Sequence, residues 1–244
     1  MAHWTVLWVL FSVTAGMATY AAAAYGGATH DAAFVALDAR LGFSWADWYG
    51  FVTRHPVLRF ALAIAYTTLM PQIIFSIIYF GLLGRNDRNA EFFFTTLIAF
   101  AITLPISWRF PALGALPYFG HTNEAAPFYF SDLQALRQHT RHVFSLAEMK
   151  GLITLPSFHT VLALLFIYVH RARNWVSKFI IFLNLAVLIS IPVGGGHYLC
   201  DMISGAIVGL ISIMIQRWLS GLILGNTKGV KKVGLATAND LGSS

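Results

Sequence analysis

Charged residues are scarce in this chain. Only 11% of its 244 residues are Asp, Glu, Lys or Arg, whereas soluble domains carry roughly 25%. Hydrophobic residues make up 57%, and the mean hydropathy is +0.67. A water-soluble globule of this size is excluded, because so few charges would leave a large apolar surface that only lipid can cover. The sequence therefore predicts an integral membrane protein.

Cysteine is also nearly absent. The single Cys200 excludes an internal disulfide framework and a cysteine-based metal cluster. The net charge of +6 suits contact with anionic lipid headgroups, and the charges are too scattered to form a nucleic-acid-binding face. We therefore expect membrane lipids as partners and no nucleic acid.

Six stretches are long and apolar enough to cross a membrane as helices, since a crossing needs about 20 residues. They lie at about 4–24, 57–83, 91–109, 152–170, 175–193 and 197–219. The first is expected to stay in the protein, because it lacks the Lys or Arg of a signal peptide and its apolar run is too long. We expect one membrane domain over 1–244, an all-α bundle of six transmembrane helices with a basic flexible tail over 220–244.

Basic residues predict the orientation, since short loops rich in Lys and Arg stay cytoplasmic. Three such regions alternate with the six crossings and fall on one side: Arg85 and Arg88; Arg171, Arg173 and Lys178; Arg217, Lys228, Lys231 and Lys232. Both termini are therefore expected on the cytoplasmic side of a plasma or inner membrane. The longer segments 25–56 and 110–151 are expected on the opposite side. The aromatic residues of 31–55 predict an interfacial helix or a re-entrant stretch there. Ser131–Gln134 has the form of a capping box and predicts a second outer helix running towards Lys150.

Two short polar segments open the fourth and sixth apolar stretches, where ionisable groups are costly unless they are paired or functional. One contains Ser157 and His159, and the other contains Gly195, Gly196, His197 and Asp201. The histidines are 38 residues apart, close to two crossings, so both are expected at the same membrane face. The chain reaches this face after an odd number of crossings from a cytoplasmic N-terminus, so we expect the face to be extracytoplasmic.

His197 and Asp201 are four residues apart and share one face of a helix. An aspartate bonded to one imidazole nitrogen fixes the tautomer and leaves the other nitrogen free to attack an electrophile. Gly195 and Gly196 allow close approach to the backbone. The amides at a helix N-terminus favour an anion, and Ser157 stands at such an N-cap position. These residues together suggest an anion pocket that holds a nucleophile.

Several alternatives stay open at this point. A Gly-Gly-Gly run is often just a turn, Gly205 and Gly209 favour helix packing, and the His–Asp pair with His159 could instead bind a metal. A small ion or proton transporter would use the same residues as a relay. It would spread ionisable groups through the membrane depth, whereas here they concentrate at one end, so we favour an enzyme.

The strings PSFH at 156–159 and H-x-x-x-D at 197–201 resemble the second and third signature motifs of the type 2 phosphatidic acid phosphatase superfamily, six-helix membrane enzymes that act on lipid phosphates. GLITLPSFHT at 151–160 and GGHYLCDMISG at 195–205 are similar to its inositol phosphorylceramide synthase branch. The resemblance implies that His197 is the nucleophile, Asp201 its orienter, His159 the general acid and Ser157 a phosphate ligand.

Two elements of the superfamily pattern are missing. Ser190-Ile191 stands where the third motif begins Ser-Arg, and the lysine of the first motif has no counterpart. The candidates for neutralising the phosphate are Arg137, Arg141, Lys150 and Arg109. The resemblance implies a metal-independent lipid phosphatase or phosphotransferase that needs no cofactor and works through a phosphohistidine. Water or the hydroxyl of a second lipid, as in a phosphosphingolipid synthase, would accept the phosphoryl group.

Overall fold

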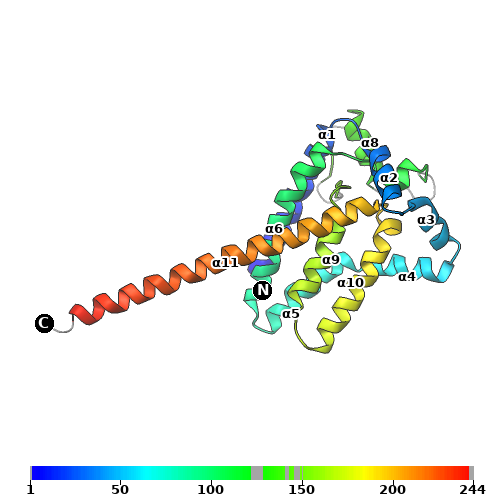
Figure 1. The fold of residues 1–244 in the computed structure, drawn as a ribbon. Helices are drawn as coiled ribbons and strands as arrows, with labels where there is room; N and C mark the ends of the chain where they lie inside the picture. Colours follow the sequence, from blue (N-terminus) through cyan, green and yellow to red (C-terminus); the bar gives the residue numbers. More distant parts are fainter. Residues whose placement is uncertain (1, 122–128, 141–142, 146–148, 150, 242–244) are drawn as a thin grey trace.

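The computed structural model describes residues 2–121, 129–140, 143–145, 149 and 151–241, with 223–241 as backbone alone (Figure 1). All regular structure among these residues is helical, which confirms the predicted all-α class. In chain order the helices are α1 (Ala2–Ala24), α2 (Asp31–Arg40), α3 (Trp45–Thr53), α4 (Pro56–Thr67), α5 (Leu69–Leu82), α6 (Asn86–Arg109), α7 (Ala115–Tyr118), α8 (Phe130–Arg137), α9 (Phe158–Val169), α10 (Trp175–Gly194) and α11 (Leu199–Leu241).

Four of these helices are long and apolar enough to cross a membrane: α1, α6, α10 and the stretch of α11 over Leu199–Leu222. The pair α4 and α5 is long enough for a fifth crossing, although the chain bends by 44° between them. Pro71 explains the bend, because it has no N–H to donate to the carbonyl of Thr67 and its ring clashes with that carbonyl. The chain is thus a multi-pass membrane protein.

The fourth expected crossing, at 152–170, is shorter than predicted. α9 has 12 residues, about 18 Å of helix, whereas the apolar core of a bilayer is about 30 Å thick. The cause lies at its start: Pro156 keeps Leu155 out of the helical region, so the helix begins only after Ser157. The count of six membrane helices is therefore not confirmed.

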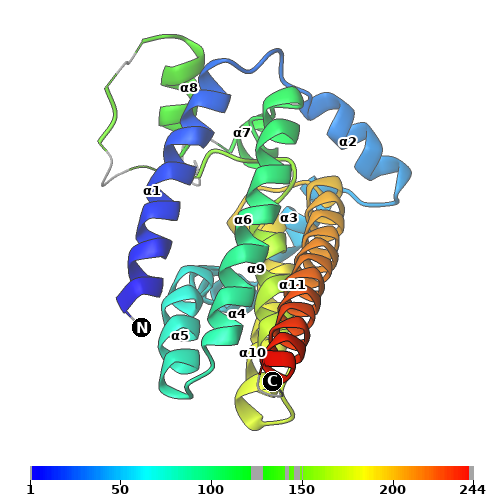
Figure 2. The ribbon, with the colours of Figure 1, turned by 90° about the vertical axis from the view of Figure 1, so that its left-hand side faces the viewer.

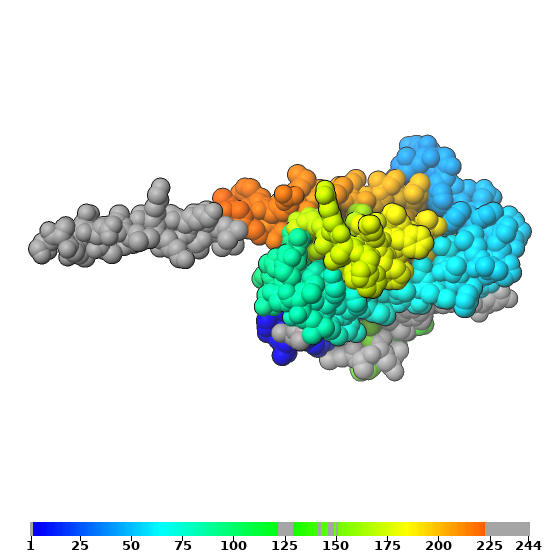
Figure 3. All heavy atoms as spheres, turned by 90° about the horizontal axis from the view of Figure 1, so that it is seen from below, coloured from blue at the N-terminus to red at the C-terminus, as the bar shows by residue number. Residues whose placement is uncertain are grey.

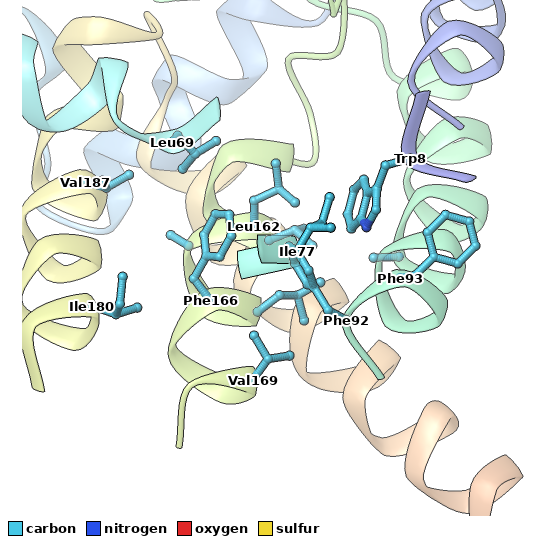
Figure 4. Packing of buried hydrophobic residues seen from close by; sticks show 14 of the residues in the cluster. Trp8, Leu69, Ile77, Phe92, Phe93, Leu162, Phe166, Val169, Ile180 and Val187 are labelled. Carbon is cyan, nitrogen blue, oxygen red and sulfur yellow. The ribbon is translucent and has the colours of Figure 1, made fainter. Parts of the chain in front are cut away.

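α9 is the central helix of the bundle. It contacts α5, α6, α10 and α11, and Figure 2 shows it enclosed by α6, α10 and α11. In Figure 4, Phe166 and Val169 of α9 lie between Ile180 of α10 and Phe92 of α6. The view from below shows α10 in yellow beside α4 in cyan and α11 in orange (Figure 3). Protein side chains rather than lipid cover α9, so this helix does not need the length of a free-standing span.

The basic turns and the N-terminal end of α1 gather at one end of the bundle. Glu91 accepts hydrogen bonds from Arg171 at 2.6 Å and from Arg88 at 3.0 Å, which joins the turn after α9 to the first turns of α6. The indole of Trp4 donates to the side chain of Asn86 at 3.3 Å. The two basic turns therefore share one side, as the sequence predicts. That this side is cytoplasmic stays a prediction.

The segments predicted to be outside gather at the opposite end, as α2, α3, α7 and α8 (Figures 1 and 2). Residues 31–55 form two short helices rather than one, because the chain turns at Gly42, whose φ is +76°. Trp45 is 2% exposed, donates to the carbonyl of Pro192 at 2.8 Å and stacks on Phe119. This tryptophan therefore anchors α3 to protein rather than to lipid headgroups.

The capping box expected at Ser131–Gln134 does not form, and the helix does not run towards Lys150. α8 starts two residues earlier, with Tyr129 rather than Ser131 as N-cap, and ends at Arg137. The carboxylate of Asp132 turns inward instead and accepts a hydrogen bond from Tyr20 of α1 at 2.5 Å. A tertiary contact has replaced the local cap.

α11 is much longer than one crossing, and in Figure 1 its C-terminal end projects beyond the bundle. Its helical backbone continues to Leu241, through most of the 220–244 tail. The flexibility of that tail stays a prediction.

The start of α9 lies directly on α11. The amide of Ser157 donates to the carbonyl of Asp201 at 2.9 Å, and a Cβ on Gly205 would lie 2.4 Å from the Ser157 carbonyl oxygen. Only glycine permits this approach of the two backbones. One turn further, a Cβ on Gly209 would meet Leu164 at an ordinary 3.6 Å. Helix packing thus explains Gly205, while Gly209 has room to spare.

The two glycines give a matched pair of variants. Gly205→Ala should lower the free energy of unfolding by about 1–3 kcal/mol, because its methyl group forces α9 away from α11. Gly209→Ala should leave it unchanged or raise it by up to about 1 kcal/mol through better helix propensity. Thermal unfolding of both variants in detergent measures the difference. Equal stability of the two would contradict the contact.

Candidate active site

The structure brings His159 and His197 next to each other. His159 lies in the first turn of α9, and His197 lies in the loop between α10 and α11. Their ring centroids are 5.6 Å apart and the rings are inclined by 61°. His197 is 3% exposed, whereas His159 is only half-buried. Two imidazoles thus share one site at the outer end of the central helices.

Asp201 lies beside His197, as predicted, although His197 lies in the loop before α11 and not on the same helix as Asp201. Its Oδ2 atom is 3.4 Å from Nδ1 of His197 and also accepts the amide hydrogen of Tyr198 at 2.9 Å. Burial lowers the pKa of His197 to about 4, and a hydrogen bond from the ring to the backbone carbonyl of Thr154 works in the opposite direction. The imidazole is therefore neutral at pH 7, the form that carries a nucleophilic lone pair.

Ser157 is the N-cap of α9. It is fully buried, and its hydroxyl oxygen accepts a hydrogen bond from the amide of Thr160 at 3.4 Å. The predicted N-cap position is therefore present, and this role accounts for the residue without a ligand. Phosphate binding by Ser157 stays a prediction.

The glycines before His197 make room for protein side chains. A Cβ on Gly195 would lie 2.8 Å from the His197 ring, and one on Gly196 would lie 3.0 Å from Leu116. Gly196 also has a φ of +64°, and its carbonyl accepts the amide hydrogen of Ala115 at 2.7 Å. Close packing explains both glycines, and contact with a phosphate stays a prediction for them.

A carboxylate occupies the N-terminus of α11. The amides of Leu199 and Cys200 donate to Asp38 at 2.7 and 2.8 Å, and Asp38 is 2% exposed. This corrects the expectation that these amides face a phosphate, because their hydrogens are already bonded to another anion. A cap from a residue so distant in the chain has no local sequence signal.

Asp31, at the start of the same helix α2, also binds backbone amides. Its carboxylate accepts hydrogen bonds from the amides of Leu113 and Gly114 and from the hydroxyl of Tyr198, each at 3.0 Å. Tyr198 directly follows His197 and is fully buried. Through Asp31 and Asp38, α2 therefore holds in place the loop that contains His197.

The two predicted cations that the structure describes, Arg137 and Arg109, have their contacts away from the histidines. Arg137 donates to the carbonyl of Gly27 at 2.5 Å, at the outer end of α1. Arg109 is exposed at the end of α6, with its guanidinium 5.2 Å from the ring centre of Phe110. Arg141 and Lys150 lie outside the described residues.

Tyr66 of α4 is a site residue that the sequence does not reveal. Its hydroxyl lies 2.9 Å from Nε2 of His159, and the two rings stack with centroids 5.0 Å apart. A tyrosine within an apolar stretch carries no local mark of such a contact. Only the packing of α4 against α10 brings it to the site.

One cavity of the described structure lies away from the predicted site residues. A cavity of about 250 Å³ lies beside the outer end of α1, and its lining residues include none of them. In the described residues of the chain, no group of three or more His, Cys, Asp or Glu side chains is arranged to hold a metal ion.

The fold and the site together define an all-α, multi-pass membrane protein with two histidines and an aspartate at one end of its central helices. The chain belongs to the PAP2 superfamily, whose sequence pattern matches residues 32–215. The match covers both histidine motifs and confirms the predicted superfamily, without assigning a branch. It makes the chain a membrane phosphatase-like protein and implies phosphate-ester substrates. No curated protein and no solved structure matches the chain.

The capping of α11 by Asp38 can be tested by substitution. Asp38→Ala should lower the free energy of unfolding by about 1–3 kcal/mol, since it leaves buried amides without an acceptor. Asp47→Ala, in the exposed first turn of α3, should cost less than about 1 kcal/mol. Thermal unfolding in detergent compares the two. An Asp38 variant as stable as the Asp47 variant would show that the amides find another partner.

Proposed function

We propose that the protein is a metal-independent lipid phosphatase or phosphotransferase that works through a phosphohistidine at the extracytoplasmic face. The observation that carries the proposal is the arrangement of His159, His197 and Asp201, in contact across α9 and α11. In this proposal the chain before α9, residues 152–157, completes a sixth passage through the membrane together with that helix.

The proposed reaction has two steps. The His197 nitrogen that does not face Asp201 attacks phosphorus, and a P–N bond forms as the P–O bond to the lipid alcohol breaks. His159 gives a proton to the departing oxygen. An acceptor hydroxyl then attacks phosphorus, His159 takes its proton, and the P–N bond breaks. Asp201 holds the His197 ring and stabilises the positive charge that develops on it.

Phosphate binding is the less defined aspect of the proposal. Ser157, Gly195 and Gly196 lie beside the histidines, and the hydroxyl of Ser157, whose oxygen is the N-cap acceptor, is also a potential donor. Arg137, Arg141 and Lys150 belong to the predicted outer segment 110–151, and Arg109 ends the membrane stretch just before it. They stay candidates for neutralising the phosphate once a substrate is bound.

A second candidate is a phosphosphingolipid synthase that transfers a headgroup phosphate to a lipid alcohol. The strings at 151–160 and 195–205 favour it, as does the absence of the superfamily's lysine and Ser-Arg arginine. The first step would be the same, and only the acceptor would differ.

Replacing the proposed nucleophile tests both candidates. His197→Ala should remove the phosphohistidine and lower turnover of a lipid phosphate by at least about 10³-fold, because no other group takes over the attack. His55→Ala is the matched control, since His55 is exposed at the start of α4. The assay combines product release with acid-labile labelling from a ³²P-lipid. Near-normal activity of His197→Ala would overturn the assignment.

A product assay on the purified protein distinguishes hydrolysis from transfer. The protein is incubated with a panel of lipid phosphates, with and without a lipid alcohol. Free phosphate as product favours the phosphatase, and a new phosphodiester lipid favours the synthase.

The lowered pKa of His197 predicts an unusual pH profile. A histidine with the ordinary pKa of about 6.5 would lose roughly 30-fold of its neutral form between pH 7.5 and pH 5. His197, with a pKa of about 4, keeps its lone pair over this range. Phosphohistidine formation from an alkyl nitrophenyl phosphodiester, whose charge is constant and whose leaving group needs no proton, should therefore stay within about 3-fold. A 30-fold fall would contradict the buried, neutral state of His197.

A further inference from the structure

Tyr66 contacts His159 in two ways. Its hydroxyl lies 2.9 Å from Nε2 of His159, within hydrogen-bond distance. Its ring stacks on the imidazole, with centroids 5.0 Å apart and planes 25° apart. The hydrogen bond and the ring contact together restrict the position and the tilt of the imidazole.

The end of α10 is shaped around this tyrosine. A Cβ on Gly194 would lie 2.6 Å from Cγ of Tyr66, so the ring rests on a bare backbone. A Cβ on Gly195 would lie 3.0 Å from the Tyr66 hydroxyl and 2.8 Å from Cδ2 of His197. Two glycines of the triplet before His197 therefore border Tyr66, and Gly195 also borders His197.

The place of the hydroxyl is also informative. Cδ2 of His197 is bonded to Nε2, the nitrogen on the side away from Asp201. The Tyr66 hydroxyl and Cδ2 of His197 lie 3.0 and 2.8 Å from the position that a Cβ on Gly195 would take. The hydroxyl thus lies between His159 and the edge of His197 at which the phosphoryl group would be received.

Packing alone does not account for the hydroxyl. A phenylalanine would fill the same space on Gly194 and stack on His159 equally well. What tyrosine adds is one donor and one acceptor at Nε2 of His159.

We propose that Tyr66 is a positioning residue that holds His159 in the orientation needed for acid catalysis. The inference rests on the proposed function and deepens it. When His159 is protonated, its Nε2–H donates to the Tyr66 oxygen, and this bond keeps the ring from turning. As the P–O bond breaks and the P–N bond to His197 forms, an N–H bond of His159 breaks and the O–H bond of the alcohol forms. His159 is left neutral, with Nε2 still bonded to Tyr66.

Tyr66→Phe tests this role, because it removes the hydroxyl and keeps the ring. For a lipid phosphate with an alkyl leaving group, kcat should fall about 10- to 100-fold while KM stays within about 2-fold. For a nitrophenyl phosphate, whose leaving group departs without a proton, kcat should stay within about 3-fold. His159→Ala should show the same dependence on the leaving group, with a larger loss for the alkyl ester.

Two further variants separate positioning from general damage. Gly194→Ala should push the Tyr66 ring away from His159 and reproduce the selective loss on the alkyl ester. Tyr79→Phe, whose hydroxyl accepts a hydrogen bond from Asn174 at the opposite end of the bundle, should leave both substrates unaffected. Activity on the nitrophenyl ester shows in each case that the variant is folded.

The outcomes distinguish the two proposals. If the wild-type protein cleaves neither ester and forms no phosphohistidine, the proposed function is overturned. If the wild-type protein is active and Tyr66→Phe equals it on both esters, or loses the same factor on both, the positioning role of Tyr66 is overturned.

Discussion

The site depends on one close contact between backbones, where the start of α9 rests on the first turns of α11. The Ser157 amide donates to the Asp201 carbonyl, and Gly205 lets the Ser157 carbonyl come closer than any side chain would allow. Because His159 follows Ser157 by two residues and His197 precedes Asp201 by four, this contact sets the distance between the two histidines. A rotation of either helix would separate them.

Buried carboxylates support this contact from the outer side. Asp31 and Asp38 are each 2% exposed and lie against backbone amides rather than against arginine or lysine. Burying a charged carboxylate is costly unless several donors satisfy it, and the amides of the 113–114 loop and of α11 supply them. The outer helices thus act as a frame that fixes the loop carrying His197, which is what a closely spaced site in a membrane protein requires.

Local pattern accounts for much of the fold. Apolar stretches of membrane length predict the positions of α1, α6, α10 and α11 to within a few residues, since lipid imposes length and composition on each span separately. The same logic fails at α9, because other helices cover it and Pro156 shortens it. It also fails at Ser131–Gln134, where Asp132 pairs with Tyr20 across 112 residues instead of capping its own helix.

The sequence alone determined the membrane class, and the motifs at 156–159 and 197–201 determined the superfamily. It also singled out His159, His197 and Asp201 as candidates, because charge is so scarce that ionisable groups at helix ends stand out. Only the tertiary structure decided what surrounds them: Asp38 on the amides of α11, and Tyr66 on Nε2 of His159 from 93 residues away in the chain. Both contacts join elements far apart in sequence. The periodicity of a helix records which of its faces is buried, and it does not record which partner covers that face.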